Sequence, residues 1–154
     1  MSTLENDHGR VFATDHWEVA HRKDARYPGY LIASSRHPSA ELYSLPTAAL
    51  AGLGPVLSRA ERILREAYSP LKVIFYKLGF SAGFSCHFHI APVTQRLMDE
   101  VARHPDYDSD PDGNDAILFL SRVYCERSLS GLEQAAQQNT VDQLRAIDET
   151  MAQK

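Results

Sequence analysis

The most informative segment of this chain is Phe84-Ser85-Cys86-His87-Phe88-His89-Ile90-Ala91-Pro92. Successive side chains of a β-strand point to opposite faces, so this stretch predicts an apolar face of Phe84, Cys86, Phe88 and Ile90. The opposite face carries Ser85, His87, His89 and Ala91. Two imidazoles side by side on one strand face are the first candidates for a functional site.

Three interpretations fit that face. A half-buried strand can carry histidines on its polar side without using them. Alternate residues of a strand can also give two imidazoles to a zinc ion, but a closed zinc site needs about two more ligands, for which His21 or His104 would be candidates. The third interpretation is phosphoryl chemistry at a histidine.

A resemblance favours the third interpretation. His89-Ile90-Ala91-Pro92 resembles the end of the histidine triad signature, in which three histidines alternate with apolar residues and two apolar residues and often a proline follow. On this match His89 is the third histidine, His87 is the middle one, and Ser85 stands where the first should be. Residues 27–33, His37 and residues 41–45 also resemble the family's proline-glycine strand, downstream histidine and helix entry. The resemblance covers roughly residues 10–92.

The resemblance implies an α+β, histidine triad-like fold, with a mostly antiparallel sheet covered by one long helix. It also implies a nucleotide hydrolase or transferase that cleaves a phosphoanhydride or phosphoramidate bond. His87 would be the nucleophile that forms a covalent nucleotidyl-histidine, and His89 would bind the phosphate oxygens, with help from backbone amides near Gly83. Ser85 can donate one hydrogen bond but cannot carry a proton near neutral pH as histidine does. The family commonly forms homodimers, and we expect no cofactor.

Two basic residues depart from the family pattern. Arg22 takes the position that commonly binds ribose, and Lys77 stands where an asparagine often precedes the glycine loop. Arginine suits phosphate or carboxylate better than a diol, so the pair suggests a more anionic ligand. Both could equally be solvated surface residues. Together with Ser85, these departures leave a second hypothesis open: a degenerate member that binds an anionic ligand without turning it over.

Composition sets the broad class. A chain of 154 residues with 44% apolar composition is long enough for one domain with a real core. The net charge of −4 is spread without basic blocks, which argues against a nucleic-acid partner. The polar start and the lack of a long apolar run predict a cytoplasmic protein without a membrane partner. Cys86 and Cys125 lie far apart in the sequence and are expected to be free thiols.

The remaining pattern divides the chain into three parts: a flexible N-terminus at 1–8, a histidine triad-like domain at 9–104, and an acidic loop with a C-terminal helical extension at 105–154, packed on the same domain. Strands are predicted at 10–14, 16–22, 30–34 and 71–78, and helices at 47–67, 94–104, 114–126 and from about 140, where Thr140-x-x-Gln143 would be a capping box. Gly54-Pro55 predicts a kink or a break in the first helix. The strand at 71–78 should form a hairpin with the histidine strand through a short loop at 79–83.

Overall fold

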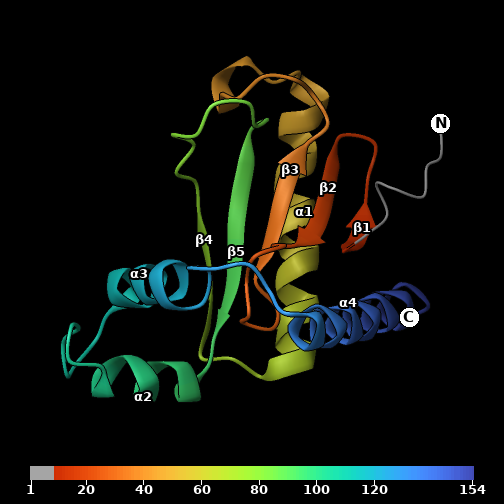
Figure 1. The fold of residues 1–154 in the computed structure, drawn as a ribbon. Helices are drawn as coiled ribbons and strands as arrows, with labels where there is room; N and C mark the ends of the chain where they lie inside the picture. The colour runs from red at the N-terminus through yellow and green to blue at the C-terminus, as the bar shows by residue number, and fades with distance from the viewer. Residues whose placement is uncertain (1–8) are drawn as a thin grey trace.

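The computed structural model describes residues 9–154, so the predicted flexible N-terminus at 1–8 lies outside the described residues (Figure 1). The strands are β1 (Arg10–Ala13), β2 (Trp17–His21), β3 (Leu31–Ser35), β4 (Lys72–Tyr76) and β5 (His87–Val93). The helices are α1 (Thr47–Tyr68), α2 (Gln95–Arg103), α3 (Gly113–Val123) and α4 (Gly131–Ala152), with a short 3₁₀ turn, η1 (Leu42–Ser44), before α1.

The five strands form one sheet in the order β1-β2-β3-β5-β4, and every neighbouring pair is antiparallel. The chain leaves β3, passes through α1 and returns as the edge strand β4, so that β5 is inserted between β3 and β4. The histidine strand is therefore paired on both sides. The predicted α+β arrangement, a mostly antiparallel sheet with one long covering helix, is confirmed.

Helix α1 covers one face of the sheet and lies behind it in Figure 1. Its buried stripe packs on side chains from the strands, and the indole of Trp17 donates from Nε1 to the carbonyl of Ala49 over 2.8 Å. The buried residues of this stripe are Ala49, Val56, Ala60, Ile63 and Leu64. The helix runs without a break past Pro55, so the predicted split does not occur. Phe88 and Ile90 of β5 point to this core, as their alternation with the histidines predicts.

Helices α2 and α3 cover only part of the opposite face. They pack on Ala91 and Val93 of β5 and on Tyr30 before β3, and these contacts form a second core. Thr94 caps α2 by accepting from the amide of Leu97 over 3.1 Å. The part of this face that carries His87 and His89 is left open beside them.

The starts of α4 and β5 differ from the sequence predictions. Helix α4 begins at Gly131 rather than near 140, because Ser130 and Glu133 form the capping box and Thr140 lies within the helix. Strand β5 begins at His87 rather than Phe84, so the connection from β4 runs over residues 77–86 and is no short hairpin loop. Gly79 and Gly83 adopt φ values of +70° and +89°, which turn the chain out of the extended conformation.

Cys86 and Cys125 are free, as expected. No helix within residues 9–154 combines the length and the apolar character needed to cross a membrane.

Candidate functional site

His87 and His89 line a cavity of about 830 Å³ on the open part of the sheet. Strand β2, the turn after it and β3 form one side, and the connection 77–86 forms the other. The lining residues are Glu18, Ala20, His21, Arg22, Lys23, Asp24, Ile32, Ser34, Leu78, Gly79, Phe80, Ser81, Phe84, Ser85, His87, His89 and Ser121. The strand register explains why the histidines share this space with β3, because His87 pairs with Ser34 and His89 with Ile32.

The imidazole of His87 is oriented from within its own loop. Its Nδ1 lies 2.9 Å from the carbonyl oxygen of Ser85. A carbonyl can only accept a hydrogen bond, so Nδ1 carries the proton and the neutral ring has its lone pair on Nε2. This is the tautomer that a nucleophilic histidine requires.

The imidazole of His89 is oriented from the sheet and is almost fully buried. Its Nδ1 lies 2.9 Å from the Tyr30 hydroxyl, and its ring stacks on that of Tyr76 with a centroid distance of 4.7 Å. The Tyr30 hydroxyl also accepts from Nη1 of Arg22 over 3.0 Å and is hydrogen-bonded to the hydroxyl of Tyr76. Arg22 can only donate, so Tyr30 gives its proton to Nδ1 of His89 when the Tyr76 hydroxyl donates to Tyr30, and that arrangement leaves Nε2–H of His89 as a donor.

Burial keeps His89 neutral. It lowers the pKa of His89 to about 4, and the positive charges of Arg22 and of protonated His87 act in the same direction. The ring can therefore donate a hydrogen bond at neutral pH without carrying a charge.

Arg22 is held by Asp24. The guanidinium donates from Nε to Oδ1 over 2.7 Å and lies 5.0 Å from the centroid of the Tyr30 ring. Burial alone would lower the pKa of Arg22, but the hydrogen bond to Asp24 and the neighbouring groups raise it, so the residue stays charged. Its charge is largely neutralised by Asp24, and its contact with Tyr30 connects this ion pair to His89.

The turn between β2 and β3 is fixed by His21. Its Nδ1 donates to the carbonyl of Arg22 and its Nε2 accepts from the amide of Gly29, each over 3.0 Å. Gly29 has φ of +88°, and a Cβ there would lie 2.6 Å from the Tyr68 ring, so the turn requires glycine. Burial lowers the pKa of His21, which favours the neutral ring that these two bonds require.

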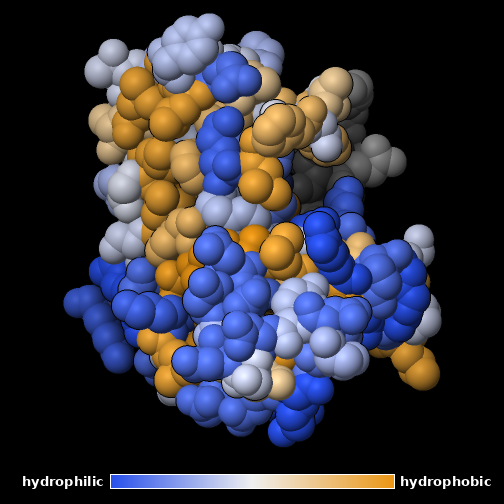
Figure 2. Space-filling view, turned by 90° about the vertical axis from the view of Figure 1, so that its left-hand side faces the viewer, coloured by the Kyte–Doolittle hydropathy of each residue, from blue (hydrophilic) through white to orange (hydrophobic). Residues whose placement is uncertain are grey.

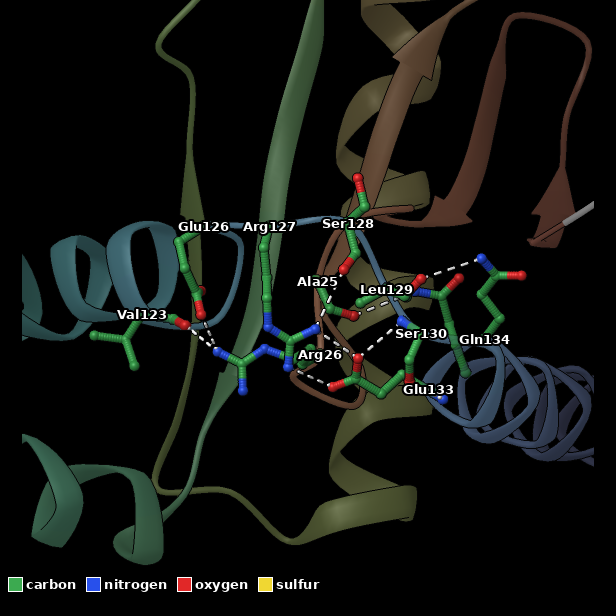
Figure 3. A network of polar contacts seen from close by, with 11 residues as sticks. Ala25, Arg26, Val123, Glu126, Arg127, Ser128, Leu129, Ser130, Glu133 and Gln134 are labelled. Carbon is green, nitrogen blue, oxygen red and sulfur yellow. Dashed lines mark hydrogen bonds and ion pairs between the residues drawn. The ribbon is translucent and has the colours of Figure 1, made fainter.

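The C-terminal extension holds the same turn from outside. Nε2 of Gln137 in α4 donates to the carbonyls of Arg22, Lys23 and Ala25 at 3.0–3.2 Å. Arg26 donates to the carbonyl of Val123 and to Glu126, and Arg127 is bound to Glu133 at the start of α4 (Figure 3). Segment 124–130 thus connects α3 to α4 while it is attached to the turn that carries Arg22.

Solved structures share this architecture. A histidine triad protein from Bradyrhizobium japonicum is 22% identical, with a TM-score of 0.62 over 95% of this chain and 94% of that one. A hypothetical histidine triad nucleotide-binding protein from Sulfolobus tokodaii is 15% identical, with a TM-score of 0.63 over 96% and 88%. A HIT-like protein from Bartonella henselae is 14% identical, with a TM-score of 0.61 over 94% and 89%. The chain has a histidine triad-like fold. No protein-family model and no curated protein sequence matches it.

Within the histidine triad-like fold, four of the six residues singled out from the sequence meet at one cavity: Ser85, His87, His89 and Arg22. Lys77 is not among the lining residues, and its ammonium lies 3.8 Å from a carboxylate oxygen of Glu41. Gly83 lines a neighbouring hollow with Arg36 and His37. The cavity lining contains two basic and two acidic residues, so its formal charges balance.

Sequence reasoning missed the tyrosines beneath His89 and the aromatic side chains of the loop. Tyr30 comes directly after Pro28-Gly29 and directly before β3, the strand that pairs with the histidine strand. Its position next to the proline-glycine turn is the sequence signal that could have identified Tyr30. Phe84 was expected on the apolar core face, but it lies before β5 and lines the cavity, with 62% of its surface exposed.

The residues described do not assemble a metal site. Among residues 9–154 no group of three or more His, Cys, Asp and Glu side chains could hold an ion. Both ring nitrogens of His21 are used by the backbone, and His104 packs against Tyr107 and Phe119 in the second core. Neither supplies the further ligand that a zinc site at His87 and His89 would need.

Proposed function

We propose that this protein cleaves a phosphoanhydride or phosphoramidate bond of a nucleotide through a covalent intermediate on His87. The observation that carries the proposal is the hydrogen bond from Nδ1 of His87 to the carbonyl of Ser85, because it leaves the Nε2 lone pair for attack on phosphorus. The description of the Sulfolobus tokodaii protein as nucleotide-binding supports a nucleotide as the ligand.

The reaction proceeds in two displacements. Nε2 of His87 forms a bond to phosphorus while the bond to the leaving group breaks, and the leaving group takes a proton from water. Water then attacks the nucleotidyl-histidine, releases the nucleoside monophosphate and restores the ring. Nε2–H of His89 donates to a phosphate oxygen and stabilises the charge that develops there. The backbone carbonyl of Ser85 orients His87. The side chain of Ser85 has no imidazole that could give a proton to the leaving group.

Intact-protein mass spectrometry after brief mixing tests the proposal. The protein is mixed with an adenosine phosphoramidate and, separately, with a diadenosine polyphosphate, and product release is followed by chromatography. We expect an added nucleotidyl mass on the wild type and none on His87→Ala. The matched control is His16→Ala, since His16 lies outside the cavity lining. Turnover by His87→Ala would contradict the proposed nucleophile.

Binding without turnover is the second candidate function. It is favoured by Ser85, which places no ionisable side chain at the first triad position. Bound nucleotide with neither adduct nor product in the same experiment would support it.

We also infer a homodimer, joined through the β4 edge. Within residues 9–154, β4 pairs only with β5, so its outer edge presents unpaired backbone groups. Leu71 and Leu78 flank this edge and are 53% and 57% exposed. Hydrophobic side chains gather over the upper half of the β4 side of the molecule (Figure 2). Sedimentation at micromolar concentration tests this inference, and a single monomeric species would contradict it.

A further inference from the structure

A second cavity lies at the far end of the histidine strand. Its volume is about 380 Å³, in the range of small-molecule sites, and within residues 9–154 it shares no lining residue with the cavity at His87. It lies where β5 ends and α2 begins, at the lower end of the sheet in Figure 1. We call it the tyrosine pocket, and its lining residues are Tyr27, Pro28, Tyr68, Pro92, Thr94, Arg96, Leu97, Glu100 and Tyr124.

Three tyrosine rings, those of Tyr27, Tyr68 and Tyr124, line the pocket. The rings of Tyr27 and Tyr124 lie 5.3 Å apart, centroid to centroid, and their planes meet at 72°. A group in the angle between two nearly perpendicular rings contacts the face of at least one of them, and that face carries the negative end of the ring quadrupole. Tyr124 already attracts a cation of this chain, because the guanidinium carbon of Arg26 lies 5.4 Å from its ring centroid. The rings therefore favour a positively charged group.

The hydroxyl protons of two of these rings are used within the protein. Tyr27 donates to the carbonyl of Pro92, and Tyr124 donates to Oε2 of Glu100 over 2.6 Å. Burial raises the pKa of both Tyr68 and Tyr124 to about 12, so these phenols stay neutral at physiological pH. Tyr27 and Tyr124 therefore have no proton left to give to a ligand, and they offer it their rings.

Glu100 places a negative charge beside the rings. Its side chain is only 28% exposed, and within residues 9–154 its ion pair is with Arg96, whose Nε lies 3.8 Å from Oε1. The Arg96 side chain is 90% exposed, and a long ion pair with so exposed a partner contributes little. The hydroxyl of Tyr124 fills one acceptor position of the carboxylate, which has about four. The pocket thus contains a largely buried negative charge that its surroundings compensate poorly.

The rings and the carboxylate together restrict the ligand. An anion would be repelled by Glu100. A metal ion would lack ligands, because no group of three or more His, Cys, Asp and Glu side chains within residues 9–154 could hold one. An alkylated ammonium ion suits both features, since its methyl groups contact ring faces and its positive charge pairs with the carboxylate. We propose that the tyrosine pocket is a binding site for an organic cation of the quaternary or alkylated ammonium class. This site is independent of the chemistry proposed at His87.

Choline and 3,3-dimethylbutan-1-ol test the site, because they share one shape and differ in a single central atom, a charged nitrogen or a neutral carbon. NMR titration of the full chain measures both affinities. We expect choline to bind about tenfold or more tightly than the alcohol, with amide shifts at Leu97, Glu100 and Tyr124. Glu100→Gln removes the charge but keeps an acceptor for the Tyr124 hydroxyl, so it should weaken choline binding about tenfold and leave the alcohol unchanged. The matched control is Asp99→Asn, since Asp99 is the adjacent residue of α2 but lies outside the pocket lining, and it should keep the wild-type preference.

Tyr124→Leu tests the rings, because it keeps an apolar side chain and removes an aromatic face. The preference for choline should fall below about threefold in this variant, whose circular dichroism should match that of the wild type. Equal affinities of the wild type for choline and the alcohol, or no binding of either at millimolar concentration, would overturn the cation site. Shifts confined to residues around His87 would overturn it too, since they would place choline in the histidine cavity. A loss in Asp99→Asn as large as in Glu100→Gln would reduce the effect to the net charge of α2 and would also contradict the proposal.

Discussion

His87 and His89 lie two residues apart on the same strand face, yet they are oriented by different parts of the molecule. His87 is oriented by a hydrogen bond inside its own loop, from Nδ1 to the carbonyl of Ser85. His89 depends on a chain of contacts that passes through Tyr30 and Arg22 to Asp24, and through the backbone of Arg22 to Gln137 in α4. Local sequence thus prepares one ring as a nucleophile, and tertiary structure prepares the other as a neutral donor.

The largest effect is expected at His87. Replacing it by alanine removes the nucleophile, so kcat should fall by about 10³-fold or more and the nucleotidyl adduct should disappear. Stopped-flow measurement of amine release gives kcat, and intact-protein mass spectrometry detects the adduct. Circular dichroism should show an unchanged fold, since His87 is only partly buried. A variant that still formed the adduct would show that another residue attacks.

His89 should matter less, because it stabilises charge and forms no bond to phosphorus. We expect His89→Gln to slow adduct formation by about 10²-fold, because a flexible amide does not reproduce the preorganised imidazole donor, while the adduct remains detectable. Single-turnover kinetics separate this step from hydrolysis. If His89→Gln abolished the adduct while His87→Ala kept it, the roles of the two histidines would be reversed.

The burial of His89 predicts a pH-dependent stability. Burial lowers its pKa from 6.5 to about 4, so between these values the unfolded chain binds a proton that the folded protein does not. The contribution is complete above 6.5 and is lost as the pH falls toward 4. We expect about 2 kcal/mol of unfolding free energy to be lost between pH 7 and pH 5, and His21 adds to this in the same direction.

Urea unfolding of the wild type and of His89→Gln measures this loss, which should be smaller in the variant. An NMR titration of the His89 ring gives the pKa directly. A midpoint near its ordinary value of 6.5 would contradict the buried, neutral ring.

The same contrast explains how much the sequence could predict. Alternation along one strand was sufficient to place Phe88 and Ile90 in the core and both histidines on the open face. The same alternation predicted the wrong side for Phe84. Gly83 adopts a positive φ, and the extended strand β5 begins only at His87, so the alternation does not reach Phe84. It also could not find Tyr30 or Gln137, because their contacts with His89 and with the turn join residues 59 and more than 100 positions apart.

Tyr30→Phe tests the first contact in the chain that holds His89. The ring would stay in the core, but Nδ1 of His89 would lose its donor and Nε2–H would no longer be the favoured tautomer. We expect adduct formation to slow about tenfold, the effect of one buried hydrogen bond of about 1.4 kcal/mol. The NMR shifts of the ring nitrogens should report a change of tautomer. Tyr107→Phe is the matched control, since Tyr107 does not line the cavity. Equal rates of adduct formation in the two variants would show that the Tyr30 hydroxyl does not orient His89.

Gln137→Ala tests the far end of that chain, where the smallest effect is expected. The side chain of Gln137 donates to three carbonyls of the turn, but Asp24 and His21 still hold the turn when the amide is removed. Adduct formation should therefore slow only about two- to threefold, while faster amide exchange at residues 22–26 reports the loosened turn. Gln138→Ala is the matched control, because Gln138 is the next residue of α4 and its side chain donates to Asp142 instead of to the turn. If Gln137→Ala loosened the turn and left His89-dependent catalysis unchanged, the contacts from Tyr30 to Asp24 alone would be sufficient to hold His89, and the C-terminal extension would stabilise the fold without serving the site.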